Sequence, residues 1–153
     1  MANRMNYGAT APGLMQAMSG LEKYLSGCGL EPGLLDLVKL RASQINGCAY
    51  CVDIHSLDLR AAGETEQRLY ALPVWQETQF FTERERAALL WTEKVTLISL
   101  DHAPDEVYEY VRPHFTDVEL ANLTLAIATI NAWNRLAISF RKEPGHYKPA
   151  KRD

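Results

Sequence analysis

The chain has 153 residues, enough for one domain that buries roughly 68–70% of the surface its unfolded chain exposes. Hydrophobic residues make up 47% and charged residues 23%, which argues against disorder. The net charge of −3 comes without a basic stripe, which argues against binding to nucleic acid. No apolar run predicts a membrane span or a secretory signal, and three cysteines do not suit a disulfide-stapled secreted scaffold. We therefore expect a cytoplasmic protein.

Apolar residues at helical spacing and residues typical of helix ends recur along the chain, whereas the alternation of apolar and polar residues typical of strands does not. Thr82 and Thr116 each open a capping box, with Glu85 and Glu119 three residues later. The sequence predicts an all-α fold in a single domain over residues 1–153, with 1–10 and 143–153 as extended tails. About seven helices are expected, over residues 12–25, 31–45, 48–63, 65–71, 82–99, 104–112 and 116–141.

Two of these helices are apolar on more than one side. The segment 31–45 carries apolar residues around most of its circumference, which predicts deep packing. The last helix, 116–141, shares this property. A monomer of this size has difficulty covering both helices, so we expect self-association.

The segment from Asn46 to His55 combines residues that suit thiol chemistry. Cys48, Cys51 and His55 stand at i, i+3 and i+7, on one stripe of a helix. A regular helix holds the i and i+3 Cβ atoms roughly 5–6 Å apart, but a disulfide needs about 3.5–4.5 Å. Asn46-Gly47 interrupts the preceding helix, and a loosened first turn at Cys48 closes this gap.

The same position favours reactive thiols. Unpaired amides at a helix N-terminus stabilise a thiolate, and His55, with a pKa expected near neutrality, is suited to carry a proton. Two thiols and a proton carrier suffice for thiol–disulfide exchange. They also suffice to reduce a peroxide through a sulfenic acid that the second thiol converts to a disulfide.

The cysteines also suit other roles. A C-x-x-C pair with a histidine is also half of a zinc site, but His102, His114 and His146 do not form a second ligand pair. Two inert, core-like cysteines are a further alternative. A thioredoxin-like fold requires flanking strands, which the sequence does not predict. Because no metal or organic cofactor motif appears, we expect no cofactor, and the redox interpretation is favoured.

At these residues the chain resembles the AhpD-like alkylhydroperoxidases of the carboxymuconolactone decarboxylase superfamily. The resemblance centres on Leu37–His55 and extends through Gly63–Tyr70, the Thr82 capping box and Ile130–Arg135. The family pattern is an acidic residue twelve positions before the first cysteine, followed by C-x-x-C-x-x-x-H. The decarboxylase branch generally lacks the cysteine pair, so the pair favours the peroxidase branch.

The resemblance implies a role for each residue of this pattern. Cys51 would attack the peroxide, Cys48 would resolve the intermediate as its disulfide partner, and His55 would relay protons. The acid falls on Asp36, where relatives usually carry glutamate. From the residues alone two alternatives stay open. Helix-end physics makes Cys48 the thiol of lower pKa, and Asp36 could simply pair with Lys39.

The function implied is a thiol-dependent peroxidase acting on a small-molecule hydroperoxide. Its implied partners are a dithiol or protein reductant and further copies of the chain, as a trimer or hexamer, with no nucleic acid or membrane partner. The alternatives are a non-catalytic redox-sensing oligomer, and a decarboxylase or lactone-acting enzyme on the same fold.

Polar and aromatic residues outside the pattern leave further choices open. Tyr50, between the cysteines, suits either a substrate pocket or core packing. A polar group recurs on the otherwise apolar last helix, at Asn131, Trp133, Asn134 and Arg135. These four side chains either approach the thiols or an oligomer interface, or form a satisfied buried network, which is the favoured interpretation.

Overall fold

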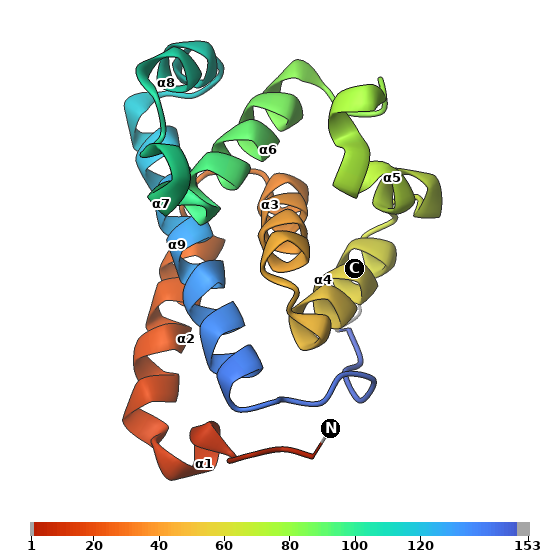
Figure 1. Cartoon of the computed structure of the whole chain (residues 1–153), viewed down its shortest axis with the longest axis vertical. Helices are drawn as coiled ribbons and strands as arrows, with labels where there is room; N and C mark the ends of the chain where they lie inside the picture. The colour runs from red at the N-terminus through yellow and green to blue at the C-terminus, as the bar shows by residue number, and fades with distance from the viewer. Residues whose placement is uncertain (1, 150–153) are drawn as a thin grey trace.

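The computed structural model describes residues 2–149, and this part of the chain is all-α, as the sequence predicted (Figure 1). Short 3₁₀ segments, η1 (Leu72–Glu77) and η2 (Arg112–His114), extend two of the helices. The α-helices in this range are α1 (Tyr7–Thr10), α2 (Pro12–Ser26), α3 (Pro32–Asn46), α4 (Ala49–Ala61), α5 (Glu66–Ala71), α6 (Glu83–Thr96), α7 (Ile98–Asp101), α8 (Asp105–Val111) and α9 (Asp117–Ser139). All seven expected helices are present, and the two additional ones, α1 and α7, have four residues each.

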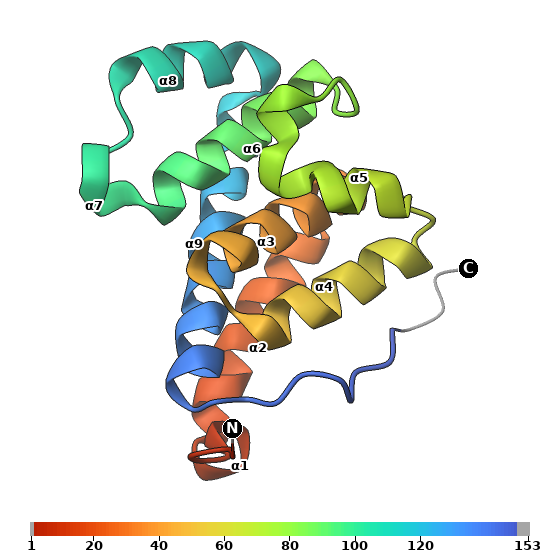
Figure 2. The same ribbon diagram turned by 45° about the vertical axis from the view of Figure 1, so that its right-hand side comes forward.

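Helix α3 lies at the centre of the fold and packs against α4, α6 and α9 (Figures 1 and 2). The deep packing predicted for it is confirmed, because its apolar residues are buried on every side: Leu34, Leu35, Leu37, Val38, Leu40 and Ala42. The chain itself thus covers the apolar surface of α3. Self-association stays a prediction.

Three clusters of buried side chains make up the interior. The largest joins α2, α3, α6, α8 and α9, and the second joins α3, α4, η1 and α6. The third is small and contains Cys48, Cys51 and Ala137, with Tyr50 packed against it. The cysteine pair therefore lies where the start of α4 meets the end of α9, apart from the two main cores.

The two predicted capping boxes are present. The Thr82 hydroxyl accepts a hydrogen bond from the Glu85 backbone amide, and the Glu85 carboxylate accepts one from the Thr82 amide. Thr116 and Glu119 repeat this arrangement at the start of α9. Each cap satisfies amides that a helix start leaves unpaired, and contributes about 1 kcal/mol of stability.

The N-terminal tail and one helix end differ from the prediction. Residues 7–10, expected to be extended, form α1, whose N-cap is the side chain of Asn6, a residue type that suits this position. The helix expected over 82–99 is interrupted at Leu97 (φ −100°, ψ 33°), and α7 follows. Leu97, Ile98 and Leu100 are exposed there. The apolar residues that extended the predicted helix to residue 99 therefore do not pack into the core.

The C-terminal segment up to residue 149 has no regular helix and runs beside α4 (Figure 2). The Gly145 amide donates to Asp53 at 2.8 Å, and the Tyr147 hydroxyl donates to Asp58 at 2.8 Å. Residues 150–153 of the expected tail lie outside the described residues. None of the helices in residues 2–149 is long and apolar enough to cross a bilayer.

Candidate active site

The turn between α3 and α4 sets the position of the cysteines. Gly47 adopts the left-handed conformation (φ 69°, ψ 33°), which ends α3. The amides of Gly47 and Cys48 donate to the carbonyls of Gln44 and Ser43, at 3.2 and 3.0 Å. Cys48 is extended (φ −84°, ψ 94°) and forms the N-cap of α4, which begins at Ala49. The loosened first turn expected from Asn46-Gly47 is thus present.

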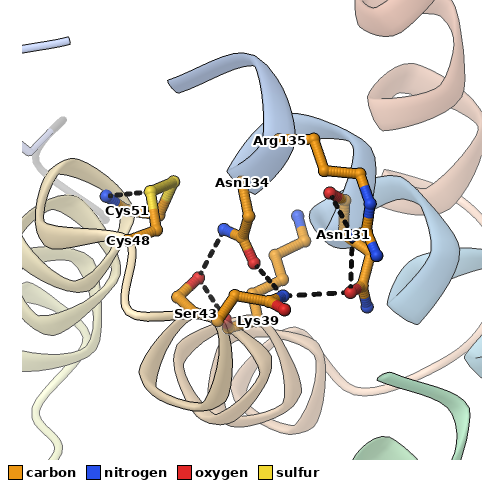
Figure 3. Close-up of a disulfide and its surroundings, with 8 residues drawn as sticks. Lys39, Ser43, Cys48, Cys51, Asn131, Asn134 and Arg135 are labelled. Atoms are coloured by element: carbon orange, nitrogen blue, oxygen red, sulfur yellow. Dashed lines mark hydrogen bonds between the residues drawn. A yellow bond between two sulfur atoms is a disulfide. The ribbon is translucent and has the colours of Figure 1, made fainter. Parts of the chain in front are cut away.

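Cys48 and Cys51 form a disulfide at this helix start (Figure 3). Their Cα atoms are 5.3 Å apart, within the usual range for disulfides. The backbone amide of Cys51 donates to the Cys48 sulfur at 3.3 Å, as it would to the oxygen of a serine cap. Both residues are buried, with exposed fractions of 1% and 2%. The pair is therefore a buried disulfide at the N-terminal turn of α4.

A buried hydrogen-bond network ties this turn to α9 (Figure 3). The Asn46 amide nitrogen donates to the side-chain oxygens of Asn131 (2.9 Å) and Asn134 (2.8 Å). Asn134 in turn donates to the Ser43 hydroxyl at 3.0 Å, and Asn131 donates to Thr96 at 3.0 Å. The buried-network interpretation of the asparagines is confirmed, and the network fixes α9 against the residues that precede the disulfide.

A cavity of about 410 Å³ opens beside Cys51. Of the four predicted site residues, Cys51, His55 and Asp36 line it, whereas Cys48 lines a neighbouring cleft. Its wall also includes polar side chains from α2, α3 and α4 and many apolar ones. The apolar and aromatic lining residues are Tyr7, Met15, Tyr50, Ile54, Ile130, Trp133 and Ala137. Tyr50 lines the cavity and also packs against the cluster of Cys48, Cys51 and Ala137, so it combines the two positions expected for it.

Glu22 of α2 is a cavity residue that the sequence did not reveal. Its carboxylate accepts hydrogen bonds from Lys39 Nζ at 2.6 Å and from Trp133 Nε1 at 3.0 Å. Lys39 thus has an ion-pair partner from another helix. Glu22 stands seven residues, or two helical turns, after Met15, which also lines the cavity. Both side chains therefore lie on the same face of α2, and this spacing was the sequence signal that could have identified Glu22.

His55 carries an uncharged imidazole at neutral pH. Burial, and secondarily the positive charge of Lys39, lower the pKa of His55 from 6.5 to about 3. Its Nδ1 atom is buried and has no hydrogen-bond partner within residues 2–149. The expectation of a pKa near neutrality is therefore wrong for the disulfide form, because the sequence could not show this burial. A neutral imidazole is the form that can accept a proton from a thiol.

Asp36 is 7% exposed and reaches the cavity from α3. It lines the same cavity as His55. Within residues 2–149 no group of three His, Cys, Asp or Glu side chains is arranged to hold a metal ion.

The sequence of residues 12–94 matches the carboxymuconolactone decarboxylase family, and the chain belongs to this family. The matched stretch contains α2, α3, α4 and α5, and so all four predicted site residues. An uncharacterised relative, YdfG of Bacillus subtilis, is 42% identical over 139 residues, which cover 91% of this chain and 95% of that protein.

Solved structures share the fold. ATU0492 from Agrobacterium tumefaciens, of unknown function and proposed to be the antioxidant defence protein AhpD, is 43% identical with a TM-score of 0.92. The similarity covers 95% of this chain and all of that one (100%). An uncharacterised peroxidase-related protein from Ralstonia eutropha JMP134, described as an AhpD core, is 25% identical with a TM-score of 0.79, over 91% of this chain and 74% of its own. The fold is therefore AhpD-like.

The network predicts a stability effect at Asn134. Asn134→Ala removes partners of Ser43 and Asn46 in a buried position, and should lower the free energy of unfolding by about 1–3 kcal/mol. Urea unfolding measures this loss. Asn3→Ala, at an exposed position, is the control and should stay within about 0.5 kcal/mol of the parent. Equal effects of the two substitutions would contradict the structural role of the network.

The lowered pKa of His55 predicts how stability depends on pH. Between pH 6.5 and about 3 the unfolded chain binds a proton at His55 that the folded chain does not bind. The free energy of unfolding should therefore fall as the pH falls through this window, by up to about 1.4 kcal/mol per pH unit from this group. Urea unfolding of the disulfide form at pH 7, 6, 5 and 4 gives the slope.

His55→Gln should make that slope shallower, because the titrating group is gone. His146→Gln, at an exposed position, serves as the matched control. If His55→Gln and the parent protein showed the same slope between pH 6 and 4, the buried neutral imidazole would be disproved.

Proposed function

We propose that the protein is a thiol-dependent peroxidase that reduces a hydroperoxide through the Cys48–Cys51 pair. The observation that carries this proposal is that Cys51, His55 and Asp36 line one cavity while Cys48 is bonded to Cys51 from outside it. A thiol able to attack, a proton acceptor and a resolving thiol are thus present together. In this family the cysteine pair favours peroxide chemistry over decarboxylation.

The reaction begins with the reduced pair. The neutral imidazole of His55 takes the thiol proton of Cys51, and the resulting thiolate attacks the terminal oxygen of the hydroperoxide. The O–O bond breaks, Cys51 becomes a sulfenic acid, and the alkoxide leaves as an alcohol after receiving the proton from His55. Cys48 then attacks the Cys51 sulfur, the disulfide forms, and the hydroxyl group leaves as water. The peroxide gains two electrons, and the two thiols lose them.

The cavity supports an organic hydroperoxide as substrate. Its volume of about 410 Å³ lies within the range of small-molecule sites. Met15, Ile54, Ile130 and Trp133 offer an apolar surface for the carbon skeleton, while Cys51 and His55 lie on the same cavity for the oxygens. Hydrogen peroxide would leave this apolar surface unused, so we expect it to be the poorer substrate.

The charged groups of the cavity control the proton on His55. The Lys39 ammonium, held by Glu22 at 2.6 Å, disfavours a second positive charge on the imidazole. A thiolate at Cys51 would carry a negative charge, which favours the positively charged imidazolium form of His55. The transfer of the proton from Cys51 to His55 therefore becomes more favourable as the thiolate forms. Asp36 lines the same cavity, and we assign it proton exchange with His55, the role that the resemblance to the family pattern implies.

The structural relatives give the proposal further support. ATU0492, proposed to be an AhpD protein, aligns with nearly the whole chain, and the Ralstonia protein is described as peroxidase-related. Neither description establishes an activity for this chain. A homo-oligomer, trimer or hexamer, recycled by a dithiol or protein reductant, is part of the same proposal.

Cysteine substitutions test the mechanism and the order of attack. Cys51→Ser should reduce peroxide consumption with dithiothreitol to the uncatalysed rate, because no thiolate remains in the cavity. Cys48→Ser should still react once per chain and retain a sulfenic acid on Cys51, which dimedone labelling and mass spectrometry detect. Cys28→Ser is the matched control, since Cys28 is the free cysteine and lies outside the cavity.

Other outcomes would contradict the proposal. A sulfenic acid on Cys48 in the Cys51→Ser variant would reverse the order of attack. Full activity in the double variant Cys48→Ser, Cys51→Ser would rule out the mechanism, and an activity that survives thiol alkylation would favour a decarboxylase or lactone-acting enzyme.

The proton relay predicts a separate kinetic effect. His55→Gln keeps a polar side chain of similar length but cannot take a proton, so the rate constant for Cys51 oxidation should fall by about 10²–10⁴-fold near neutral pH. Stopped-flow measurement against pH should show that the variant regains rate as the pH approaches that of thiol ionisation. A parent-like rate in His55→Gln at neutral pH would remove the imidazole from the mechanism.

A further inference from the structure

The disulfide lies between two separate hollows of the surface. Cys51 lines the cavity of about 410 Å³ described above, and Cys48 lines a second cleft of about 550 Å³. Neither cysteine lines both hollows. Tyr50, Ala137 and Lys142 line both and so form the wall between them. The two cysteines of one disulfide therefore line different hollows.

The second cleft is rich in positive charge. Arg4, Arg141 and Lys142 line it, with Glu143 as the carboxylate among its lining residues. The Arg4 backbone amide donates to the Phe140 carbonyl at 3.0 Å, which holds the N-terminal segment against the end of α9. This local excess of positive charge contrasts with the net charge of −3 of the whole chain.

The two arginines are available to a ligand in different ways. Arg141 is exposed, and its guanidinium forms no ion pair with any residue in the range 2–149. Arg4 is also exposed, and one of its guanidinium nitrogens donates to the Ser139 carbonyl at 3.1 Å, so it keeps its full charge. Two arginines without an ion pair in the described part of the chain thus line the same cleft as Cys48.

We propose that this second cleft receives the reductant, and that the reductant is a small dithiol carrying a carboxylate. This inference rests on the proposed function, since it assigns the step that returns the disulfide to two thiols. The volume of about 550 Å³ suits a small molecule. The arginines bind the carboxylate and attract the thiolate, which is itself an anion.

The reduction balances as two exchange steps. A reductant thiolate attacks the Cys48 sulfur, the Cys48–Cys51 bond breaks, and its electron pair leaves on Cys51 as a thiolate. The second reductant thiol, as thiolate, then attacks the sulfur bound to Cys48, forms an internal disulfide within the reductant, and expels Cys48 as a thiolate. The protons of the two reductant thiols end on the protein thiols, and two electrons pass from the reductant to the protein.

This direction of attack returns Cys51 in its reactive form. The leaving thiolate appears in the cavity beside His55, where the next peroxide binds. Attack on Cys51 instead would place the reductant in the peroxide cavity and leave the thiolate on Cys48. Because the wall formed by Tyr50, Ala137 and Lys142 separates the hollows, alcohol product and reductant need not compete for one space.

Two dithiols that differ in a single charge test the proposal. The disulfide form is mixed with dihydrolipoate or with dihydrolipoamide, in the absence of peroxide, and the appearance of protein thiols is followed by stopped flow. At low ionic strength the rate constant should be about tenfold larger for the carboxylate than for the amide. Raising the salt to roughly 0.5 M should bring the ratio of the two rate constants toward one.

Charge reversals locate the effect in the cleft. Arg141→Glu and Arg4→Glu should each lower the ratio, and together they should bring it to one or below. Arg112→Glu is the matched control, because Arg112 is exposed, lies outside the cleft and should leave the ratio unchanged. A ratio near one in the parent protein, or a ratio unaffected by both reversals, would overturn the proposal. If the reductant were a protein dithiol, the parent protein would show a ratio near one.

A trapping experiment identifies the sulfur that is attacked. The disulfide form is treated with 3-mercaptopropionate in the presence of iodoacetamide, and its peptides are mapped by mass spectrometry. The thiol should be found on Cys48 and the carbamidomethyl group on Cys51, whereas the reverse pattern would overturn the inference. Because no peroxide is present, a failure of peroxidase activity with these results intact would refute the proposed function alone.

Discussion

The left-handed conformation of Gly47 is the constraint on which the rest of the site depends. A residue with a side chain is strained at φ 69°, but glycine adopts this conformation without cost from a Cβ atom. The turn ends α3, leaves Cys48 extended as the N-cap of α4, and so allows the two sulfurs to meet. If α3 continued through this point, Cys48 and Cys51 would be separated as in any regular helix, too far apart for a disulfide.

Helix α9 holds the turn between α3 and α4 in place. Helix α9 lies beyond residues 12–94, the part that matches the family, yet Asn131 and Asn134 bind the residues before the disulfide, and Trp133 reaches Glu22 in the cavity. Asn131 and Asn134 are buried, and because each has partners, they specify how α9 packs on α3. A site carried by α3 and α4 is thus held in place by a helix about 85 residues further along the chain.

The chemistry of the cavity follows from an uneven distribution of charge. Lys39 forms an ion pair with Glu22, and burial together with the positive charge of Lys39 keeps His55 uncharged. In the proposed reaction this uncharged imidazole is the group that accepts the proton of the Cys51 thiol. Tyr50, Ala137 and Lys142 separate this cavity from a second, cationic cleft that Cys48 lines. In the proposed cycle the peroxide meets the Cys51 thiol on one side, and the reductant meets the disulfide on the other.

The sequence by itself determined the all-α class, the helices with strong caps and the C-x-x-C-x-x-x-H pattern. Each of these is a local property: Thr82 and Thr116 mark helix starts, and Asn46-Gly47 marks the break before Cys48. The short helices α1 and α7 were not predicted, because α1 buries only Tyr7 and α7 buries no residue, so neither has an apolar periodicity to detect.

Only the tertiary structure decided which side chains face each other. Glu22 and Lys39 are 17 residues apart, and their ion pair depends on how α2 packs on α3. The pKa of His55 depends on burial by several helices, so a value near neutrality was the natural expectation from sequence and was wrong. The separation of Cys48 and Cys51 into two hollows has the same origin, because the wall between them joins α4 to the end of α9 and the segment that follows it.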